Sequence, residues 1–324
     1  MTGGGRVLLL SDPAMAEHRP PDHPERPERL VAVAAGVADG AVAAGADLER
    51  PAAEPADAEA LERVHPARYL AALDEAASQR GGWIDADTYL GSRSMVAARL
   101  AAGATIQAAA AAARGEAQVA FAVVRPPGHH ARRERPAGFC LLNNVALAAM
   151  ALRAAGLAER IAIVDWDVHH GDGTQAIFDD DPDLCYASTH QMPLYPGSGA
   201  SDERGSGLGL GTKHNVALPP GSGDVAFVDA WLTELLPEIE AFAPEAILVS
   251  AGYDAHRLDP LAELEVTADG YRVAAEAVGQ LARNAGLSGV ALTLEGGYDL
   301  GALRESAAAT VAGLLSGLSG LAAA

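Results

Sequence analysis

Hydrophobic residues occur along this chain in short continuous runs, and polar turn residues follow each run. The runs are apolar at consecutive positions and do not alternate with polar residues, which is typical of strands buried on both faces. We therefore predict parallel strands over residues 6–11, 118–124, 161–164, 184–190, 245–250 and 289–294.

Longer segments between these strands carry the composition and the end signals of helices. Strand and helix therefore alternate, which predicts an α/β fold with helices on both faces of a central parallel sheet. Residues 191–223 are rich in Gly and Pro, and we interpret them as one long loop. The predicted helices cover residues 28–45, 92–114, 143–155, 225–242, 268–285 and 302–324, with shorter helical pieces between 46 and 91.

Composition narrows the classes of function. The chain has 324 residues, 49% of them hydrophobic, and a formal net charge of −20. Nucleic-acid binding needs a basic patch, so we expect no nucleic-acid partner. The Ala-rich runs are interrupted by Arg, Gly or Glu, so we expect no membrane span. The N-terminal stretch lacks the apolar core and the cleavage site of a signal peptide, so we expect none. Cys140 and Cys185 form no disulfide framework, so we expect a cytoplasmic protein, and the Ala, Gly and Arg bias suggests a bacterial source.

The stretch richest in chemically active groups is 160–175, where a buried strand runs into a cluster of acids and imidazoles. Side chains alternate along an extended chain, so Asp165, Asp167 and His169 can point to the same side. In open α/β sheets, ligands bind at the carboxyl ends of the strands. Acids gathered there would repel one another, which predicts a bound cation.

A third ligand for this cation could come from Asp259, which follows a later strand. Asp167, His169 and Asp259 would make an open site that suits zinc, and that would also accept Fe(II) or Mn(II). The segments that must meet there span much of the chain. They predict one domain over residues 1–324 and no division into two.

Paired imidazoles suggest what the cation is used for. His129 and His130 are adjacent, and the carboxylates of Asp165 and Asp172 could hold them in defined tautomers. Such a pair can act as general base and general acid on a water that the metal activates. Tyr298 follows two glycines and could donate to an oxyanion. These groups predict metal-assisted hydrolysis of an amide or an ester.

Several of these segments, taken in chain order, resemble the histone deacetylase superfamily, and its class II and bacterial histone deacetylase-like members most closely. The resemblance implies a single-domain arginase/deacetylase-type fold, with the active site at the carboxyl ends of the strands. The segments are HPERPERL at 23–30, RPPGHHA at 125–131, GFC and NN within 138–144, DWDVHHGDGTQ at 165–175, SAGYDAH and DP within 250–260, and EGGY at 295–298.

The resemblance also implies roles for individual residues. Asp167, His169 and Asp259 match the metal ligands, and Tyr298 matches the residue that polarises the acetyl carbonyl. His130 matches the base, and the resemblance gives Asp165 to His129 and Asp172 to His130 as orienting acids. The implied substrate channel contains Gly138, Phe139, Tyr195 and Leu261, and the implied structural potassium site contains Asp165, Asp167, His169, Ser188 and Thr189.

The implied activity is zinc-dependent removal of acetyl or other acyl groups from lysine side chains of proteins or peptides. An acetylpolyamine or another small acylated amine is the alternative substrate. Polyamine-specific relatives carry an acid where this chain has Leu261, which favours acyl-lysine. Tyr298 argues against a non-catalytic acyl-lysine binder, and together with His129 it fits a one-metal site better than an arginase-like binuclear manganese site. The Ala-rich helices at 92–114 and 302–324 could serve as a homo-oligomer interface.

Overall fold

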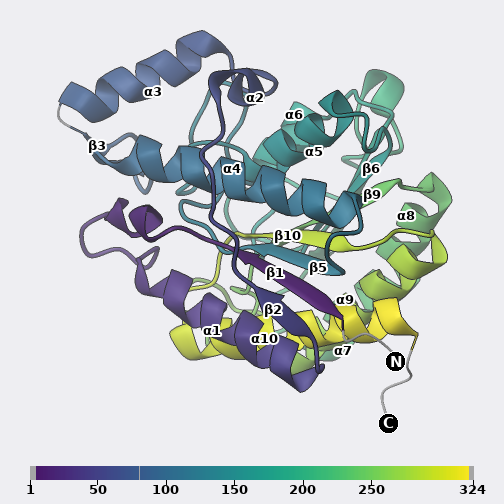
Figure 1. The fold of residues 1–324 in the computed structure, drawn as a ribbon. Coiled ribbons are helices and arrows are strands. Elements are labelled where there is room, and N and C mark those ends of the chain that lie inside the picture. The colour runs from purple at the N-terminus through teal and green to yellow at the C-terminus, as the bar shows by residue number, and fades with distance from the viewer. Residues whose placement is uncertain (1–4, 80, 321–324) are drawn as a thin grey trace.

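The structure is a computed structural model that describes residues 5–79 and 81–320. The strands of the main sheet are β1 (Arg6–Leu10), β2 (Asp47–Glu49), β5 (Val119–Ala122), β6 (Ile161–Asp165), β7 (Leu184–Gln191), β8 (Lys213–Leu218), β9 (Ala246–Ala251) and β10 (Val290–Leu294). They are all parallel, in the order β2-β1-β5-β10-β9-β6-β7-β8 (Figure 1). The predicted parallel sheet is therefore confirmed. A separate antiparallel ribbon joins β3 (Gly82–Trp83) and β4 (Tyr89–Leu90).

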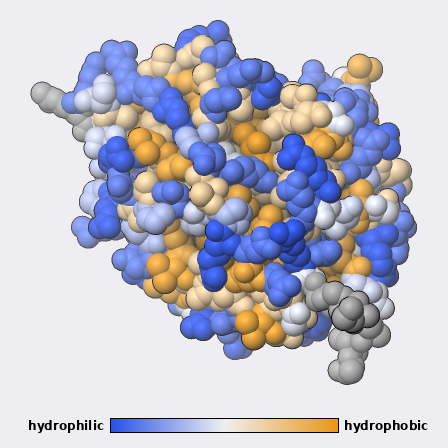
Figure 2. All heavy atoms as spheres, in the orientation of Figure 1, coloured by the Kyte–Doolittle hydropathy of each residue, from blue (hydrophilic) through white to orange (hydrophobic). Residues whose placement is uncertain are grey.

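Helices cover both faces of this sheet. They are α1 (Glu28–Ala43), α2 (Ala58–Glu62), α3 (Ala67–Gln79), α4 (Ser94–Ala113), α5 (Asn144–Ala154), α6 (Asp172–Ile177), α7 (Asp224–Asp229), α8 (Leu236–Phe242), α9 (Ala268–Asn284) and α10 (Leu300–Ser319). α1, α9 and α10 pack together on one face, whereas α4 and α5 pack together on the other (Figure 1). Hydrophilic side chains dominate the surface seen from this side, with small hydrophobic groups between them (Figure 2). The last residues of the predicted helix 302–324 lie outside the described residues.

Helix α4 is long and apolar enough to cross a membrane by length and composition alone. In this fold it is a core helix, because 72% of its apolar window is buried and it packs against α5, β5 and β10. Its small side chains allow a close approach to the neighbouring loop. A Cβ at Gly103 would lie 1.8 Å from the carbonyl oxygen of Glu54. The rest of the chain therefore covers most of α4 and leaves little of this helix for an oligomer interface.

The chain order and the sheet order differ in a way that creates the site. β5 lies beside β10, and β6 lies beside β9, so segments far apart in the sequence are neighbours at the centre of the sheet. Because the strands are parallel, the loops after these four strands meet at one edge. The loops are 125–130, 165–172, 252–259 and 295–298, which are the segments that carry the predicted chemistry.

The sequence-based prediction missed the two edge strands, β2 and β8. Residues 191–223 are therefore not one loop, because β8 lies within them. Its first residues are buried through polar contacts: Lys213 Nζ donates to the carbonyl of Leu184 at 2.8 Å, and Asn215 Nδ2 donates to Gln175 Oε1 at 2.8 Å. β8 contains no continuous apolar run, because Lys213, His214 and Asn215 are its first three buried residues and Leu218 is its one buried apolar residue.

The predicted helix over 225–242 is also modified. It consists of α7, a π-helical segment at Ala230–Leu235 and α8. Pro237, in the first turn of α8, has no amide hydrogen, and its ring would clash with the carbonyl four residues earlier in a regular α-helix. The wider π turn before it accommodates the proline without ending the helix.

Candidate active site

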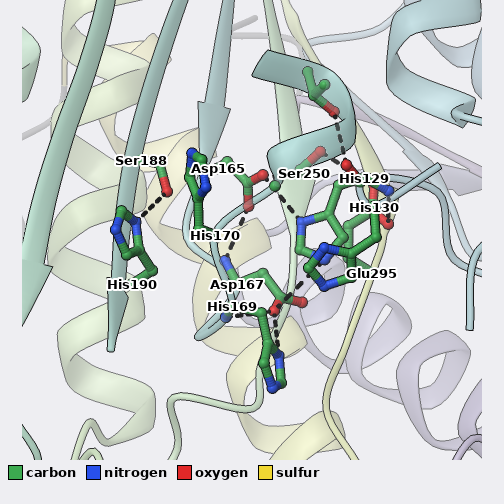
Figure 3. Close-up of polar contacts among 12 residues, drawn as sticks. His129, His130, Asp165, Asp167, His169, His170, Ser188, His190, Ser250 and Glu295 are labelled. Atoms are coloured by element: carbon green, nitrogen blue, oxygen red, sulfur yellow. Dashed lines mark hydrogen bonds and ion pairs between the residues drawn. The ribbon is translucent and has the colours of Figure 1, made fainter. Parts of the chain in front are cut away.

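A cavity of about 230 Å³ opens where the four central loops meet. His129, His130, Asp167 and His169 lie close together in Figure 3, on the loops that follow β5 and β6. The described residues that line the cavity are Asp87, Pro127, His129, His130, Gly138, Phe139, Asp167, His169, Leu194, Tyr195, Leu261, Gly296 and Tyr298. Most of the residues predicted for catalysis and for the substrate channel therefore face one space.

The floor of the cavity carries a cluster with the geometry of a metal site. Asp167, His169 and Asp254 each offer a ligand atom, and these atoms lie within 4.8 Å of one another. His169 Nδ1 lies 3.1 Å from Asp167 Oδ1 and 3.2 Å from Asp254 Oδ2. Burial disfavours the charged ring, but these two hydrogen bonds outweigh it and raise the pKa of His169 to about 10. Asp167 and His169 are two of the ligands predicted from the sequence, whereas Asp254 had no predicted role.

Asp259, the third predicted ligand, lies beside this cluster. Its Oδ2 accepts the backbone amide of Tyr298 at 2.6 Å, and its Oδ1 accepts the backbone amide of Leu261 at 3.0 Å. Both of these partners line the cavity, so Asp259 lies next to it. Its assignment as a metal ligand stays a prediction, with Asp254 as the competing carboxylate.

The acids of this site outnumber the groups that can balance them. Burial, and then the charge of Asp167, raises the pKa of Asp254. Burial, and then the charge of Asp254, raises the pKa of Asp259 to about 7. A cation among these oxygens would remove the repulsion. Carboxylate oxygens and one imidazole nitrogen form a donor set that fits a divalent ion such as zinc.

The first imidazole of the pair, His129, is held by Asp165. Its Nδ1 lies 3.1 Å from Asp165 Oδ2, and its Nε2 lies 3.8 Å from Asp167 Oδ1 (Figure 3). Burial disfavours the charged ring, but the charges of Asp167 and Asp165 outweigh it and raise the pKa of His129 well above its usual range. His129 is therefore the member of the pair that favours a proton.

The second imidazole, His130, is held by Asp172. Its Nδ1 lies 2.9 Å from Asp172 Oδ1, and its ring centre is 4.1 Å from that of His129. Burial, and then the charge of His129, lowers the pKa of His130 to about 3, although Asp172 opposes the shift. His130 is therefore the neutral member of the pair, as a general base must be. The structure pairs each histidine with the acid that the resemblance gave it.

Tyr298 approaches the same cavity from the loop after β10. Burial raises the pKa of its phenol well above the usual range, so the hydroxyl keeps its hydrogen and can donate it. Two neighbours hold the ring: the guanidinium carbon of Arg29 lies 5.0 Å from its centre, and the ring of Phe139 lies 5.9 Å away at 84°. A fixed hydroxyl donor is what oxyanion stabilisation requires.

The predicted channel residues Gly138, Phe139, Tyr195 and Leu261 all line the cavity. Gly138 and Phe139 both have a positive φ, 52° and 69°, and Phe139 is unusual among non-glycine residues in this respect. A Cβ at Gly138 would lie 2.4 Å from Cδ2 of His130, so this position needs glycine. The Tyr195 ring lies 5.1 Å from that of His130 at 82°. These side chains make an aromatic wall beside the imidazole pair.

The residues predicted for potassium lie on β6, on β7 and in the loop after β6. Asp165 of β6 and Ser188 of β7 are register partners, whereas Asp167 and His169 follow in the loop and line the catalytic cavity. Ser188 Oγ lies 2.9 Å from His190 Nδ1 (Figure 3). Within the described ranges, Thr189 Oγ1 is buried without a hydrogen-bond partner. This arrangement leaves the potassium site a prediction.

Two further residues, for which no role was predicted from the sequence, position the site. Glu295 Oε2 accepts the backbone amides of Gly128 at 2.6 Å and His129 at 3.1 Å, which fixes the chain that carries the imidazoles. Tyr186 donates its hydroxyl to Asp165 Oδ2 at 3.0 Å. An acid directly after an apolar strand was a usable signal for Glu295. Tyr186 gave none, because a tyrosine inside a strand looks like a packing residue.

Comparisons of the sequence identify relatives over most of its length. The family described as the histone deacetylase domain matches residues 23–314. Histone deacetylase 15 of Arabidopsis thaliana is 41% identical over 96% of this chain, which spans only 55% of that relative's length. A probable deacetylase of Archaeoglobus fulgidus is 39% identical, over 90% of this chain and 81% of the relative. The histone deacetylase-like amidohydrolase of Pseudomonas aeruginosa is also 39% identical, over 78% of this chain and 67% of the relative.

Solved structures agree with these matches. The HD domain of HDA15 superposes with a TM-score of 0.89 at 38% identity, over 97% of this chain and 89% of that one. An acetylpolyamine aminohydrolase from Burkholderia pseudomallei superposes with a TM-score of 0.83 at 32% identity, over 95% and 98%. Sequence and fold therefore place the chain in one group, and the protein belongs to the histone deacetylase family.

Proposed function

We propose that this protein is a zinc-dependent amidohydrolase that removes acetyl groups from lysine side chains. The observation that carries the proposal is the convergence of three elements on one cavity. These are the carboxylate and imidazole cluster around Asp167 and His169, the two His–Asp pairs, and the buried phenol of Tyr298. Each element supplies a function that amide hydrolysis needs.

The residues divide the reaction between them. A bound zinc ion would polarise the acyl carbonyl and make an attacking water more acidic. His130 is neutral, and because its Nδ1–H faces Asp172, its Nε2 is free to accept the proton of that water. Tyr298 donates its hydroxyl hydrogen to the oxyanion as the carbonyl oxygen gains charge. A protonated histidine of the pair then gives its proton to the leaving amine.

The shape and polarity of the cavity support acyl-lysine as the substrate. Phe139 and Tyr195 would contact the aliphatic stem of a lysine, and Leu261 offers no charge to a distant ammonium group. The solved relatives include an acetylpolyamine aminohydrolase, so an acetylated polyamine is the alternative substrate. An acid at the position of Leu261 would favour that alternative, and this chain lacks it.

The proposal extends to the ions and to the setting of the enzyme. Fe(II) is the alternative to zinc, because the ligand set contains two oxygens for one nitrogen. A structural potassium ion near Asp165 and Ser188 would raise thermal stability in potassium over sodium buffer. A cytoplasmic location and a homo-oligomeric state stay predictions.

A direct comparison of substrates tests the proposal. We would measure kcat/KM of the purified, zinc-loaded protein on an acetyl-lysine peptide and on acetylspermidine. We expect turnover of both to be sensitive to chelation and the peptide to be preferred. A large preference for acetylspermidine would show that the substrate is an acetylpolyamine and not acyl-lysine. If neither compound is turned over, the protein deacetylates neither class of amine and the proposal is rejected.

A further inference from the structure

We propose that Arg132 is a positioning residue of the active site, which acts on His130 through Asp172. The two oxygens of Asp172 have separate partners. Oδ1 lies 2.9 Å from His130 Nδ1, whereas Oδ2 accepts Arg132 Nε at 3.1 Å and Nη2 at 2.8 Å. The guanidinium therefore binds the carboxylate oxygen that does not face the imidazole.

The other His–Asp pair is held differently. Asp165 Oδ2 faces His129 and accepts the hydroxyl of Tyr186 at 3.0 Å, and its Oδ1 accepts the backbone amide of Asp167 at 3.2 Å. These donors are neutral. The guanidinium on Asp172 thus distinguishes the His130 pair, which contains the predicted base, from the His129 pair.

The backbone around Arg132 fixes the direction from which its side chain reaches Asp172. Residues 132–135 form a tight turn in which Arg132 N donates to Arg135 O at 2.9 Å. The Asp172 side chain is only 5% exposed, while that of Arg132 is 43% exposed. The guanidinium therefore covers the buried carboxylate and separates it from solvent. Without it, water could enter and compete with His130 for Asp172.

A second cavity makes this arrangement testable. A space of about 240 Å³ lies on the outer side of Asp172, and Arg132, Asp172, His170, Gln175 and Ser198 are among its lining residues. Truncation of Arg132 would enlarge this space toward solvent. A free guanidinium ion in the buffer could then occupy the place of the lost side chain and restore the contact with Oδ2.

The activity arm of the test rests on the proposed function and uses Arg132→Ala, Arg132→Lys and the control Arg135→Ala. Arg135 is in the same turn, but its Nη2 lies 4.0 Å from Asp172 Oδ2 and its side chain is 62% exposed. We expect Arg132→Ala to lower kcat on an acetyl-lysine peptide roughly tenfold with little change in KM, because a charge-assisted hydrogen bond is lost. Arg132→Lys should recover part of this loss, and millimolar guanidinium should stimulate Arg132→Ala but neither the wild type nor Arg135→Ala.

A second arm does not depend on activity. We expect the hydrogen-bonded Nδ1–H protons of His129 and His130 to give far-downfield proton NMR signals, which His130→Gln would assign. We expect Arg132→Ala to shift or broaden the His130 signal, to leave the His129 signal in place, and to regain the original signal with guanidinium. An unchanged His130 signal, or equal effects of Arg132→Ala and Arg135→Ala, would overturn the role of Arg132. A shifted signal in a protein that hydrolyses no acetyl-lysine would support the role and reject only the proposed substrate.

Discussion

The backbone amide of Tyr298 donates a 2.6 Å hydrogen bond to Oδ2 of Asp259. This bond joins the loops after two neighbouring strands, β10 and β9, and links the predicted oxyanion donor to a predicted metal ligand. The position of the phenol therefore depends on the same carboxylate that would hold the ion. Substitution of either residue should weaken polarisation of the acyl carbonyl. Tyr298 would act through its hydroxyl, and Asp259 would act through the metal ion.

Removal of the Tyr298 hydroxyl tests its role as an oxyanion donor. We expect Tyr298→Phe to lower kcat on an acetyl-lysine peptide by roughly 100- to 1000-fold, which is the usual effect of one lost oxyanion donor. KM and bound zinc should change little, because the ring and the Asp259 contact remain. Steady-state kinetics and metal analysis of the same preparation measure both.

Tyr271→Phe is the matched control for this change. Tyr271 is fully buried, and in the part of the chain that the structure describes its hydroxyl has no hydrogen-bond partner. It does not line the catalytic cavity. We expect near-normal kcat. Near-normal turnover by Tyr298→Phe would show instead that its hydroxyl has no part in the chemistry.

A comparison of Asp259→Asn with Asp254→Asn identifies the third metal ligand. We expect Asp259→Asn to lose zinc and activity. Asp254 also accepts the backbone amide of Val168 at 2.8 Å, so its other oxygen can serve to orient His169. Loss of an orienting partner usually lowers metal affinity roughly 10- to 100-fold. Asp254→Asn should therefore still bind zinc, but more weakly than the wild type. Chelator competition measures both affinities, and the reverse ranking would make Asp254 the ligand.

A buried ion cluster under the site predicts how stability depends on pH. Glu25 is fully buried; its Oε2 accepts Arg125 Nη2 at 2.6 Å and its Oε1 accepts Arg29 Nη1 at 3.0 Å. Burial opposes ionisation, but the charges of Arg125 and Arg29 outweigh it and lower the pKa of Glu25 from 4.5 to about 2. As the pH falls, Glu25 therefore takes up a proton in the unfolded chain at a higher pH than in the folded protein. The stabilisation is therefore complete above about pH 4.5 and is lost toward pH 2.

Glu25→Gln should remove this contribution. We expect the free energy of unfolding at pH 7 to fall by roughly 3 kcal/mol, and the difference from wild type to shrink as the pH drops below 4.5. Denaturant unfolding at several pH values measures it. Glu59→Gln is the control, because Glu59 pairs with Arg63 at the surface and its side chain is 83% exposed. Equal effects of the two changes, or a difference that does not depend on pH, would contradict the account of Glu25.

Leu261 tests the basis of substrate choice. We expect Leu261→Glu to raise kcat/KM on acetylspermidine relative to an acetyl-lysine peptide by roughly tenfold, because a carboxylate at the cavity wall can bind a distant ammonium group. Leu261→Gln has a similar volume without the charge and should not show the gain. If neither variant changes the ratio, this position does not select the substrate.

The fold was predictable because apolar runs such as those in β6 and β9 are buried on both faces and stand out in the sequence. The edge strands were not. β2 has only three residues and both of its ends are exposed, whereas Lys213 and Asn215 of β8 are buried by hydrogen bonds and not by apolar packing. The His–Asp pairs could be expected from motifs. The position of Asp254 beside His169 and the hydrogen bonds from Arg132 to Asp172 could not be expected in this way. Both depend on distances between loops, which the periodicity of the sequence does not encode.

The central claim is a metal-dependent deacetylase of acetyl-lysine, and one measurement tests it most directly. Deacetylation of an acetyl-lysine peptide would be followed for the purified protein as isolated, after chelation, and after zinc is added back, with bound metal determined at each step. We predict that activity disappears with the metal and returns at about one zinc ion per chain. Activity that survives complete removal of metal, or a fully zinc-loaded protein without any turnover of the peptide, would contradict the claim.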